Sequence, residues 1–313
     1  MKYSIIALAI TLLQHSANTL AEFTSLAGDY SDVTTVVISP TCPSGGATLP
    51  ATIFTILPTS DGTAYVSSDP ANLITVTNNN GVMTFDWTGF GEGVKSGGVQ
   101  IGLPADQLKS VSVGGDTDSQ ILDGFTQLNG LDVLDDSELT ATISSSETDS
   151  IKINVSGDST LTLSTNVKVV DRNTNVGGIS GDSTVYLETP SYEDFYVGGD
   201  STLSVKGNLV NGDVSGDSEV TVTGTVTGVT LSGDSELSAP SCENVSADIS
   251  SSCTEGSQDV TVDVTEMAMT ISGTYICGVS SSNGEELFFS SGHQAAAVAG
   301  GTIVGALATF LLL

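Results

Sequence analysis

Apolar and polar residues alternate strictly along the middle of the chain. In Val155-Ser-Gly-Asp-Ser-Thr-Leu161, apolar or small residues occupy every second position and mostly polar residues lie between them. The phrase recurs as ISGDSTVYL, VGGDSTLSV, VSGDSEVTV and LSGDSELSA, beginning at residues 179, 197, 214 and 231. This alternation of β-branched and aliphatic residues with polar ones predicts strands. The glycine and aspartate of each phrase would interrupt a helix.

The repeated aspartate gives the length of the structural unit. It occurs at Asp116, Asp136, Asp158, Asp182, Asp200, Asp217 and Asp234, at intervals of 17 to 24 residues. An apolar residue precedes it by three positions each time: Val113, Val133, Val155, Ile179, Val197, Val214 and Leu231. Periods near 20 residues are typical of stacked units that bury their apolar faces against one another.

We therefore predict an all-β fold, a right-handed parallel β-solenoid (β-helix) with about 17–24 residues per coil. A β-sandwich of antiparallel strands is the alternative.

Four segments are expected along the 313 residues. Residues 1–21 have the charge, apolar run and small residues of a secretory signal peptide. Residues 22–98 repeat less and are expected to form N-terminal β coils or a cap. Residues 99–281 are the repeat solenoid, whose final turns would include DVTVDVTEMAMTISGTYIC. Residues 282–313 end in an uncharged run and are a removed attachment signal or a C-terminal membrane anchor.

The C-terminal segment predicts a place at the cell surface. Small residues at 281–284, a polar spacer and an apolar tail form the pattern of a glycosylphosphatidylinositol (GPI) attachment signal, with Ser282 or Asn283 as the attachment residue. A spanning helix is the alternative for the tail. We expect a protein secreted to the extracellular side of the plasma membrane and held there through a lipid anchor.

Charge and histidine content exclude several classes of function. Without Lys2, Glu285 and Glu286, the mature chain has 6 basic and 35 acidic residues. Such a surface repels nucleic acid, so we expect no nucleic-acid partner. Both histidines, His15 and His293, lie in the segments predicted to be removed. A Ser-His-Asp or Cys-His arrangement and a histidine-ligated zinc site are therefore excluded. We predict no enzymatic activity and no cofactor beyond weakly bound Ca²⁺.

Cysteines and sequons suit a secreted chain. The four cysteines, Cys42, Cys242, Cys253 and Cys277, allow three pairings. We favour Cys242–Cys253, which are close in sequence, and this leaves Cys42–Cys277 to join the two ends. Asn154 and Asn244 begin N-x-S sequons and are predicted glycosylation sites.

The alternation directs the repeated aspartates to the outside. Consecutive coils would then hold carboxylates about 4.8 Å apart. One interpretation is structural: each carboxylate accepts backbone N–H groups in its turn. The other is weak Ca²⁺ binding, because hard oxygen ligands suit this ion. The candidate ligands gather near the two ends of the row, at Asp116, Asp118, Asp136 and Glu138 and at Asp217, Glu219, Asp234 and Glu236.

One stretch resembles a known family. The run VQIGLPADQLKSVSVGGDTDSQI at 99–121 leads into the SGDS units, and ADISSSCTEGSQDVTVDVTEMAMTISGTY closes them. This pattern resembles the auto-transporter adhesin "head GIN" domain family of bacterial surface proteins, over about residues 52–275. That family reads G-S-G-D where this chain reads S-G-D-S. The resemblance implies a β-solenoid-like fold and a surface or adhesion role, and it brings no catalytic residues.

The leading functional hypothesis is a non-enzymatic, acidic, adhesin-like surface protein. Its partner would be an extracellular protein, glycan, matrix or cation-bridged polymer. The alternative is a β-helical carbohydrate-active enzyme that uses paired carboxylates. Aromatic residues that stack on sugars are few, and Trp87 is the single tryptophan. An ice-binding threonine row fails because Thr160 and Thr162 are not repeated at Tyr186 and Glu219.

Overall fold

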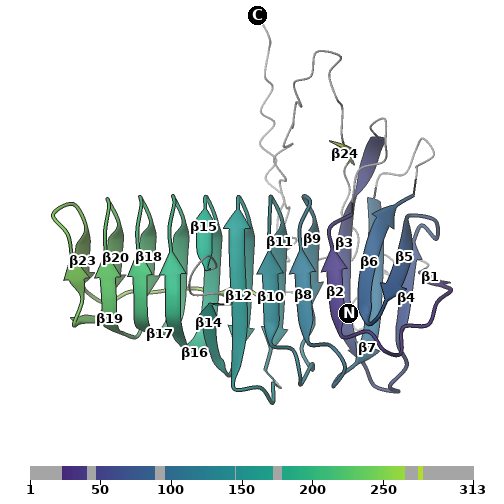
Figure 1. Cartoon of the computed structure of the whole chain (residues 1–313), viewed down its shortest axis with the longest axis horizontal. Coiled ribbons are helices and arrows are strands. Elements are labelled where there is room, and N and C mark those ends of the chain that lie inside the picture. Colours follow the sequence, from purple (N-terminus) through teal and green to yellow (C-terminus); the bar gives the residue numbers. More distant parts are fainter. Residues whose placement is uncertain are drawn as a thin grey trace, which may run out of the picture.

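The chain folds into a column of stacked β-coils (Figure 1). A computed structural model describes residues 23–40, 47–88, 96–144, 146–171, 178–264 and 274–277, and these contain strands and no helix. About seven coils stack in parallel as a β-solenoid, which confirms the predicted fold and excludes the β-sandwich.

Each coil crosses two faces, joined by the S-G-D-S turn. The first face contains the strands that precede this turn: β2 (Thr35–Ile38), β8 (Ser110–Val113), β10 (Gly130–Val133), β12 (Ser150–Gly157), β14 (Lys168–Asp171), β15 (Ile179–Gly181), β19 (Thr225–Leu231), β21 (Ser241–Glu243) and β22 (Ser246–Ala247). The second face contains those that follow it: β3 (Ala47–Thr59), β9 (Asp118–Ile121), β11 (Glu138–Ile143), β13 (Thr160–Thr165), β18 (Glu219–Val222), β20 (Glu236–Ala239) and β23 (Ser252–Glu255). The long strands β16 (Thr184–Val197) and β17 (Thr202–Val214) run from the second face into the first.

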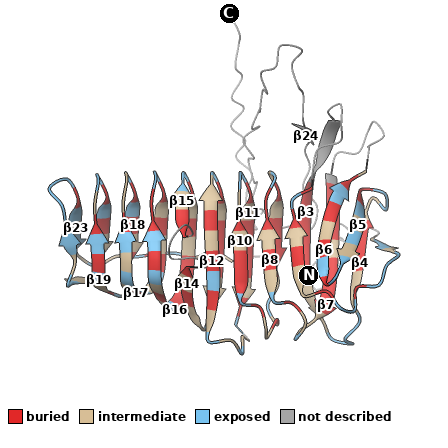
Figure 2. Ribbon diagram, in the orientation of Figure 1, coloured by how far each residue is buried: buried red, intermediate tan, exposed pale blue. Residues whose placement is uncertain are grey.

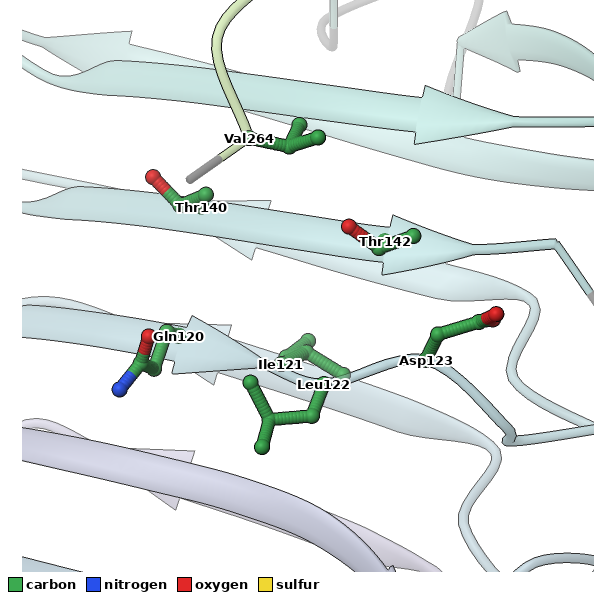
Figure 3. A pocket seen from close by; sticks show the side chains of 7 residues that line it. All are labelled: Gln120, Ile121, Leu122, Asp123, Thr140, Thr142 and Val264. Carbon is green, nitrogen blue, oxygen red and sulfur yellow. The ribbon is translucent and has the colours of Figure 1, made fainter. Parts of the chain in front are cut away.

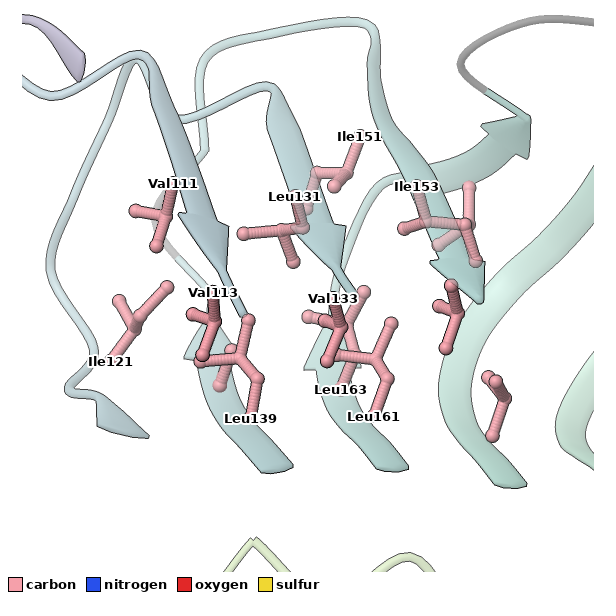
Figure 4. Close-up of a cluster of buried hydrophobic side chains, with 14 of the residues drawn as sticks. Val111, Val113, Ile121, Leu131, Val133, Leu139, Ile151, Ile153, Leu161 and Leu163 are labelled. Atoms are coloured by element: carbon pink, nitrogen blue, oxygen red, sulfur yellow. The ribbon is translucent and has the colours of Figure 1, made fainter. Parts of the chain in front are cut away.

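Apolar columns fill the space between the faces. On the first face, parallel register aligns Val113, Val133, Val155, Ile179, Val197, Val214 and Leu231, as the sequence predicts. All are at most 1% exposed. The facing column of the second face includes Leu139, Leu161 and Val185. Figure 4 shows side chains from both faces meeting in the interior, and Figure 2 shows the buried positions alternating along the strands.

The glycine of the repeated S-G-D-S motif allows the backbones of successive coils to come into close contact. Gly157, Gly181, Gly199, Gly216 and Gly233 have φ between 73° and 88°. A Cβ added to Gly199 would lie 2.5 Å from the carbonyl oxygen of Gly181 in the preceding coil. That oxygen accepts the N–H of Asp200 at 2.9 Å. Glycine therefore satisfies both a left-handed backbone and a close approach between coils.

A buried serine holds the turn from inside. Ser159 is fully buried, and its hydroxyl lies 2.8 Å from the carbonyl oxygen of Ser156 and 2.9 Å from that of Asp135 in the preceding coil. Its equivalents Ser183, Ser201 and Ser218 make the same two contacts. The hydroxyl thus links adjacent coils as well as the two ends of its own turn.

The structural interpretation of the aspartate side chains is wrong for most of the row. Within the described part of the chain, the following carboxylates accept no hydrogen bond: Asp136, Asp158, Asp182, Asp200, Asp217 and Asp234. The backbone N–H of the aspartate, rather than its side chain, bonds to the preceding coil, for example at Asp158, Asp182 and Asp217. The fold therefore does not use these carboxylates as backbone acceptors.

Antiparallel strands cap the N-terminal end of the stack. The cap comprises β1 (Thr24–Leu26), β4 (Tyr65–Asp69), β5 (Ile74–Asn79), β6 (Val82–Trp87) and β7 (Ser96–Pro104). On the second face, β7 pairs parallel with β3, β4 pairs antiparallel with β7, and β1 pairs antiparallel with β4. On the first face, β6 pairs parallel with β2, and β5 pairs antiparallel with β6. Between the faces, the ring of Phe54 lies 5.5 Å from that of Phe85 and 6.1 Å from that of Trp87. These aromatic rings close the core at this end.

A disulfide closes the other end. Cys242 lies in register with Val226 on the first face, and Cys253 with Leu237 on the second. Both cysteines thus continue apolar columns, and the bond between them crosses the interior of the last coil. The predicted Cys242–Cys253 pairing is confirmed. Cys42 lies outside the described residues, so its bond to Cys277 stays a prediction.

The carboxylate of Asp248 accepts the backbone N–H groups of the last turn of the stack. It accepts the N–H of Gly233 in the preceding coil at 3.0 Å and those of Ser250 and Ser251 at 3.1 and 2.9 Å. The Ser251 hydroxyl, 2.7 Å away, is the largest cause that lowers the pKa of Asp248 to about 2. This carboxylate is held ionised by the groups that the last turn leaves exposed.

The chain leaves the stack after β23, where the sequence predicted further coils. Residues 256–264 form no strand. Val264 lies beside Thr140 and Thr142 of β11, several coils back toward the cap (Figure 3). Strand β24 (Thr274–Cys277) then pairs antiparallel with the start of β3. The DVTVDV stretch therefore returns along the outside of the second face, so its alternation does not indicate another coil.

Replacing Gly199 with alanine should destabilise the stack more than the same change at Gly62. Both glycines have positive φ, 78° and 71°, but nothing lies within 4 Å of a Cβ on Gly62. Gly62→Ala should cost about 1 kcal/mol of unfolding free energy through backbone strain. Gly199→Ala should cost at least about 2 kcal/mol more, through overlap with the preceding coil. Urea unfolding of both variants measures the difference, and equal losses would contradict the close approach.

Candidate functional site

The structure places the repeated aspartates in a row along one edge of the solenoid, at the turns between its faces. Asp136, Asp158, Asp182, Asp200, Asp217 and Asp234 are exposed, and Asp116 is half-buried. Successive coils are about 4.8 Å apart, so neighbouring carboxylates repel one another. We call the exposed aspartates of this edge, from Asp136 to Asp234, the acidic row.

The predicted calcium ligands lie together in pairs. Asp118 is the register partner of Glu138, and Glu219 that of Glu236. The aspartates of the same coils lie two residues before them in the turn. Within the described residues, no group of three or more His, Cys, Asp or Glu side chains is arranged to hold a metal ion. Because Ca²⁺ takes six to eight oxygen ligands, binding here stays a prediction.

Other predicted sites lie partly in the described structure. Asn154 is half-buried in β12, opposite Asp132, and Asn244 is exposed with φ 53°. Glycosylation at both stays a prediction. Residues 1–21, Ser282 and Asn283 lie outside the described residues. In the part of the chain that the structure describes, no helix has the length and apolar character to cross a bilayer.

One carboxyl group is turned into the interior. Asp171, at the end of β14, is 6% exposed. It accepts hydrogen bonds from the hydroxyl of Tyr192 and, at 2.6 Å, from the backbone N–H of Tyr196. Burial is the largest cause that raises the pKa of Asp171 to about 7, and the two hydrogen bonds oppose it. This residue was not predicted from the sequence.

The position of Asp171 explains its burial. β14 ends at Asp171 and β15 begins at Ile179, in the coil where the interval between repeated aspartates is longest, at 24 residues. The carboxylate of Asp171 accepts the N–H of Tyr196 from the following coil, which a parallel ladder would otherwise bond to a backbone carbonyl. Gly178 makes room, because a Cβ there would lie 2.5 Å from Oδ2 of Asp171. The carboxylate of Asp171 therefore takes the place of a backbone acceptor for Tyr196.

A first hollow, of about 180 Å³, lies beneath the returning C-terminal segment. Residues of β9 and β11 form its floor and Val264 overhangs it, as Figure 3 shows. Its carboxylate, Asp123, already accepts the N–H of Ser144 at 2.8 Å. This hollow therefore presents little chemistry for a ligand.

A second hollow, of about 270 Å³, opens on the outside of the first face across β16, β17 and β19. Its lining residues are Asp194, Phe195, Tyr196, Asn211, Gly212, Asp213, Gly228 and Thr230. Tyr196, Asp213 and Thr230 are register neighbours with exposed side chains. Asp194, Asn211 and Gly228 form a second column with positive φ, at 51°, 54° and 69°. The hollow lies along this second column.

The ring of Tyr196 is fixed beside this hollow. It lies over Gly198, where an added Cβ would overlap the hydroxyl end of the ring. Its hydroxyl oxygen accepts a hydrogen bond from Ser215 at 3.0 Å. The side chain is nevertheless 39% exposed. The sequence carried a signal for this arrangement: the phrase reads V-G-G-D-S at 197, with glycine where most units have serine.

Comparisons with known proteins identify the fold alone. A scan against models of protein families finds no match, and neither does a search of curated proteins. A "putative adhesin" from Parabacteroides merdae is similar in structure, with a TM-score of 0.50 and 13% identity over 75% of this chain and 95% of that one. A "putative lipid binding protein" from Parabacteroides distasonis has a TM-score of 0.45 and 12% identity, over 75% and 96% of the two chains. The first likeness supports the solenoid fold that the "head GIN" resemblance implies, whereas no family model assigns the chain to that family.

Neutralising part of the acidic row should stabilise the protein at low ionic strength. The double change Asp217→Asn and Asp234→Asn removes like charges on neighbouring coils and no hydrogen bond of the described structure. The melting temperature should rise in dilute buffer, and the gain should shrink in about 0.5 M NaCl as salt screens the repulsion. Asp106→Asn, which removes an exposed charge outside the row, is the control. A lower melting temperature would show that the fold needs these carboxylates.

Protein stability should depend on the ionisation of Asp171. Because its folded pKa of about 7 lies above the unfolded value near 4, the bound proton stabilises the folded state at low pH. This contribution is lost as pH rises toward 7. Between pH 5.5 and 7.5 the unfolding free energy should fall by on the order of 2 kcal/mol. Asp171→Asn keeps an acceptor for Tyr196 and should flatten the dependence in urea titrations; an unchanged slope would contradict this assignment.

Proposed function

We propose that the protein is a non-enzymatic, acidic, adhesin-like protein of the cell surface that binds an extracellular partner. The observation that carries this proposal is the acidic row, a line of exposed carboxylates that the fold does not use as hydrogen-bond acceptors. Any residue with a backbone N–H could replace each aspartate in the turn. Repeating a mutually repulsive charge instead favours a role outside the fold, in binding cations or basic groups.

Three further features support a binding role at the surface. The secretory and GPI signals predict display outside the cell. The parallel stack holds outward side chains at a constant spacing along a rigid column, which suits recognition of an extended partner. The resemblance to the "head GIN" family and the description of the Parabacteroides merdae protein as a "putative adhesin" both favour adhesion.

The carbohydrate-active enzyme is less well supported. Such enzymes need two carboxylates beside the scissile bond, one of them with a raised pKa. Asp171 has a raised pKa, but it faces the interior and is held by Tyr192 and Tyr196. The indole of Trp87 is 7% exposed in the core of the cap, where it cannot stack on a sugar. These positions favour binding over hydrolysis.

Cells that display the full chain should attach to a matrix-coated surface through the acidic row. The test expresses the chain with its own signals in a eukaryotic host and counts the cells retained under flow, in Ca²⁺ and in chelator. Asn at the row positions Asp158, Asp182, Asp200, Asp217 and Asp234 should reduce retention at least severalfold, because it removes five adjacent charges. Release by phosphatidylinositol-specific phospholipase C would establish the lipid anchor.

The matched control makes the same charge change outside the row. It carries Asn at Asp69, Asp106, Asp149 and Asp259 and Gln at Glu243, whose side chains accept no hydrogen bond in the described structure, and it should attach as well as the unmodified protein. If both variants lose attachment equally, overall charge rather than the row is responsible. If displaying cells attach no better than cells without the protein, the adhesive function is wrong.

A further inference from the structure

The second hollow combines an aromatic surface with unused hydrogen-bonding groups. In the described residues, the side chains of Asp194, Asn211, Asp213 and Thr230 are exposed and make no hydrogen bond with the protein. Two of them offer carboxylate acceptors, Asn211 offers both donor and acceptor atoms, and Thr230 offers a hydroxyl. The fixed ring of Tyr196 borders the same hollow.

The ring of Tyr196 is held in place before any ligand binds. One side of it rests on the sheet at Gly198, Ser215 holds its hydroxyl, and 39% of the side chain remains open to solvent. A ring fixed in this way loses little conformational entropy on binding. An exposed, immobilised aromatic face is the surface on which the C–H groups of a sugar ring pack.

The sequence departs from its own repeat to build this arrangement. The position of Gly198 is serine at 156, 180, 215 and 232 and glycine at 114, and a side chain at 198 would displace the ring of Tyr196. The outward residues in register with Tyr196 are Asp213 and Thr230, so one coil alone carries the aromatic. Neither Tyr196 nor Gly198 is needed to continue the stack.

We propose that this hollow binds a neutral hexopyranose unit of an extracellular polysaccharide, with the sugar ring on Tyr196 and its hydroxyls on Asp194, Asn211, Asp213 and Thr230. This inference rests on the proposed surface-binding function and adds to the acidic row a second contact, with a neutral sugar. Sugar hydroxyls both donate and accept, and the hollow offers both kinds of group; a cationic side chain would need acceptors alone. The two aspartates repel uronic acids and sulfated sugars.

Titration of the purified full chain with cellohexaose, mannohexaose and N-acetylchitohexaose tests the site. Saturation-transfer NMR detects weak binding, and calorimetry gives the affinity. We expect millimolar or tighter binding of at least one neutral hexamer and none of hexagalacturonate. Tyr196→Ala should weaken binding about tenfold, the equivalent of one lost stacking contact.

Two further variants isolate the role of the ring. Gly198→Ser restores the repeat and keeps every side chain of the hollow, so it should fold normally, yet it should weaken binding by displacing the ring. Tyr186→Ala removes a half-buried tyrosine of the second face and should leave binding unchanged. Melting temperatures establish that each variant is folded.

Several outcomes would overturn the inference. The first is that none of the neutral hexamers binds at about 10 mM, an order-of-magnitude limit for a single weak subsite. The second is that Tyr196→Ala and Gly198→Ser leave the binding unchanged. The third is competition by octalysine, which would indicate that the hollow binds a basic peptide instead. Release of shortened oligosaccharides would support the sugar site and contradict the non-enzymatic function. Attachment of displaying cells without sugar binding would overturn this site and leave the proposed function standing.

Discussion

The close approach of successive backbones at the S-G-D-S turn is the constraint on which the column depends. At this turn a carbonyl of one coil accepts an N–H and approaches a serine hydroxyl of the next, while glycine removes the side chain that would separate them. The contacts repeat at the turns of Asp158, Asp182, Asp200 and Asp217, so each of these turns fixes the register of the two strands it joins. Once the register is fixed, each inward residue stacks on the inward residue of the preceding coil, and the apolar columns form.

Departures from the repeated sequence occur where the structure differs from a regular coil. At the end of β14 the carboxylate of Asp171 takes the place of a backbone acceptor, although this buries an acid. At the last coil two cysteines replace aliphatic residues, and Asp248 receives the amides of the final turn. Next to Tyr196, a glycine replaces a serine. Each change is local, since a coil contacts its immediate neighbours only.

The regular part of this structure was predictable from the sequence because period-two alternation and a conspicuous 17- to 24-residue interval both require stacked strands. The inward direction of Val155 and Ser159 follows from the same pattern. The pairing of Cys242 with Cys253 was predicted from their closeness in the sequence. The path of residues 256–264 could not be predicted from the sequence, because an alternating segment can pack on the outside of a sheet as well as within it. Asp171 was missed because its role arises from a contact between coils, which no local pattern records. Tyr196 was missed although glycine at 198, in place of the serine of most units, marks its position.

If the predicted lipid anchor is attached, the return of the chain after β23 sets which end of the stack lies nearest the membrane. The last coil is farthest along the stack from the cap, yet β24 pairs with β3 beside the cap. The predicted attachment residues, Ser282 and Asn283, follow Cys277 by five and six positions. With a lipid at either of them, the cap would lie nearest the bilayer and the disulfide-closed coil would be the distal tip. A pull exerted by a bound partner would then reach the anchor through the pairing of β24 with β3, without unwinding the coils from their closed end.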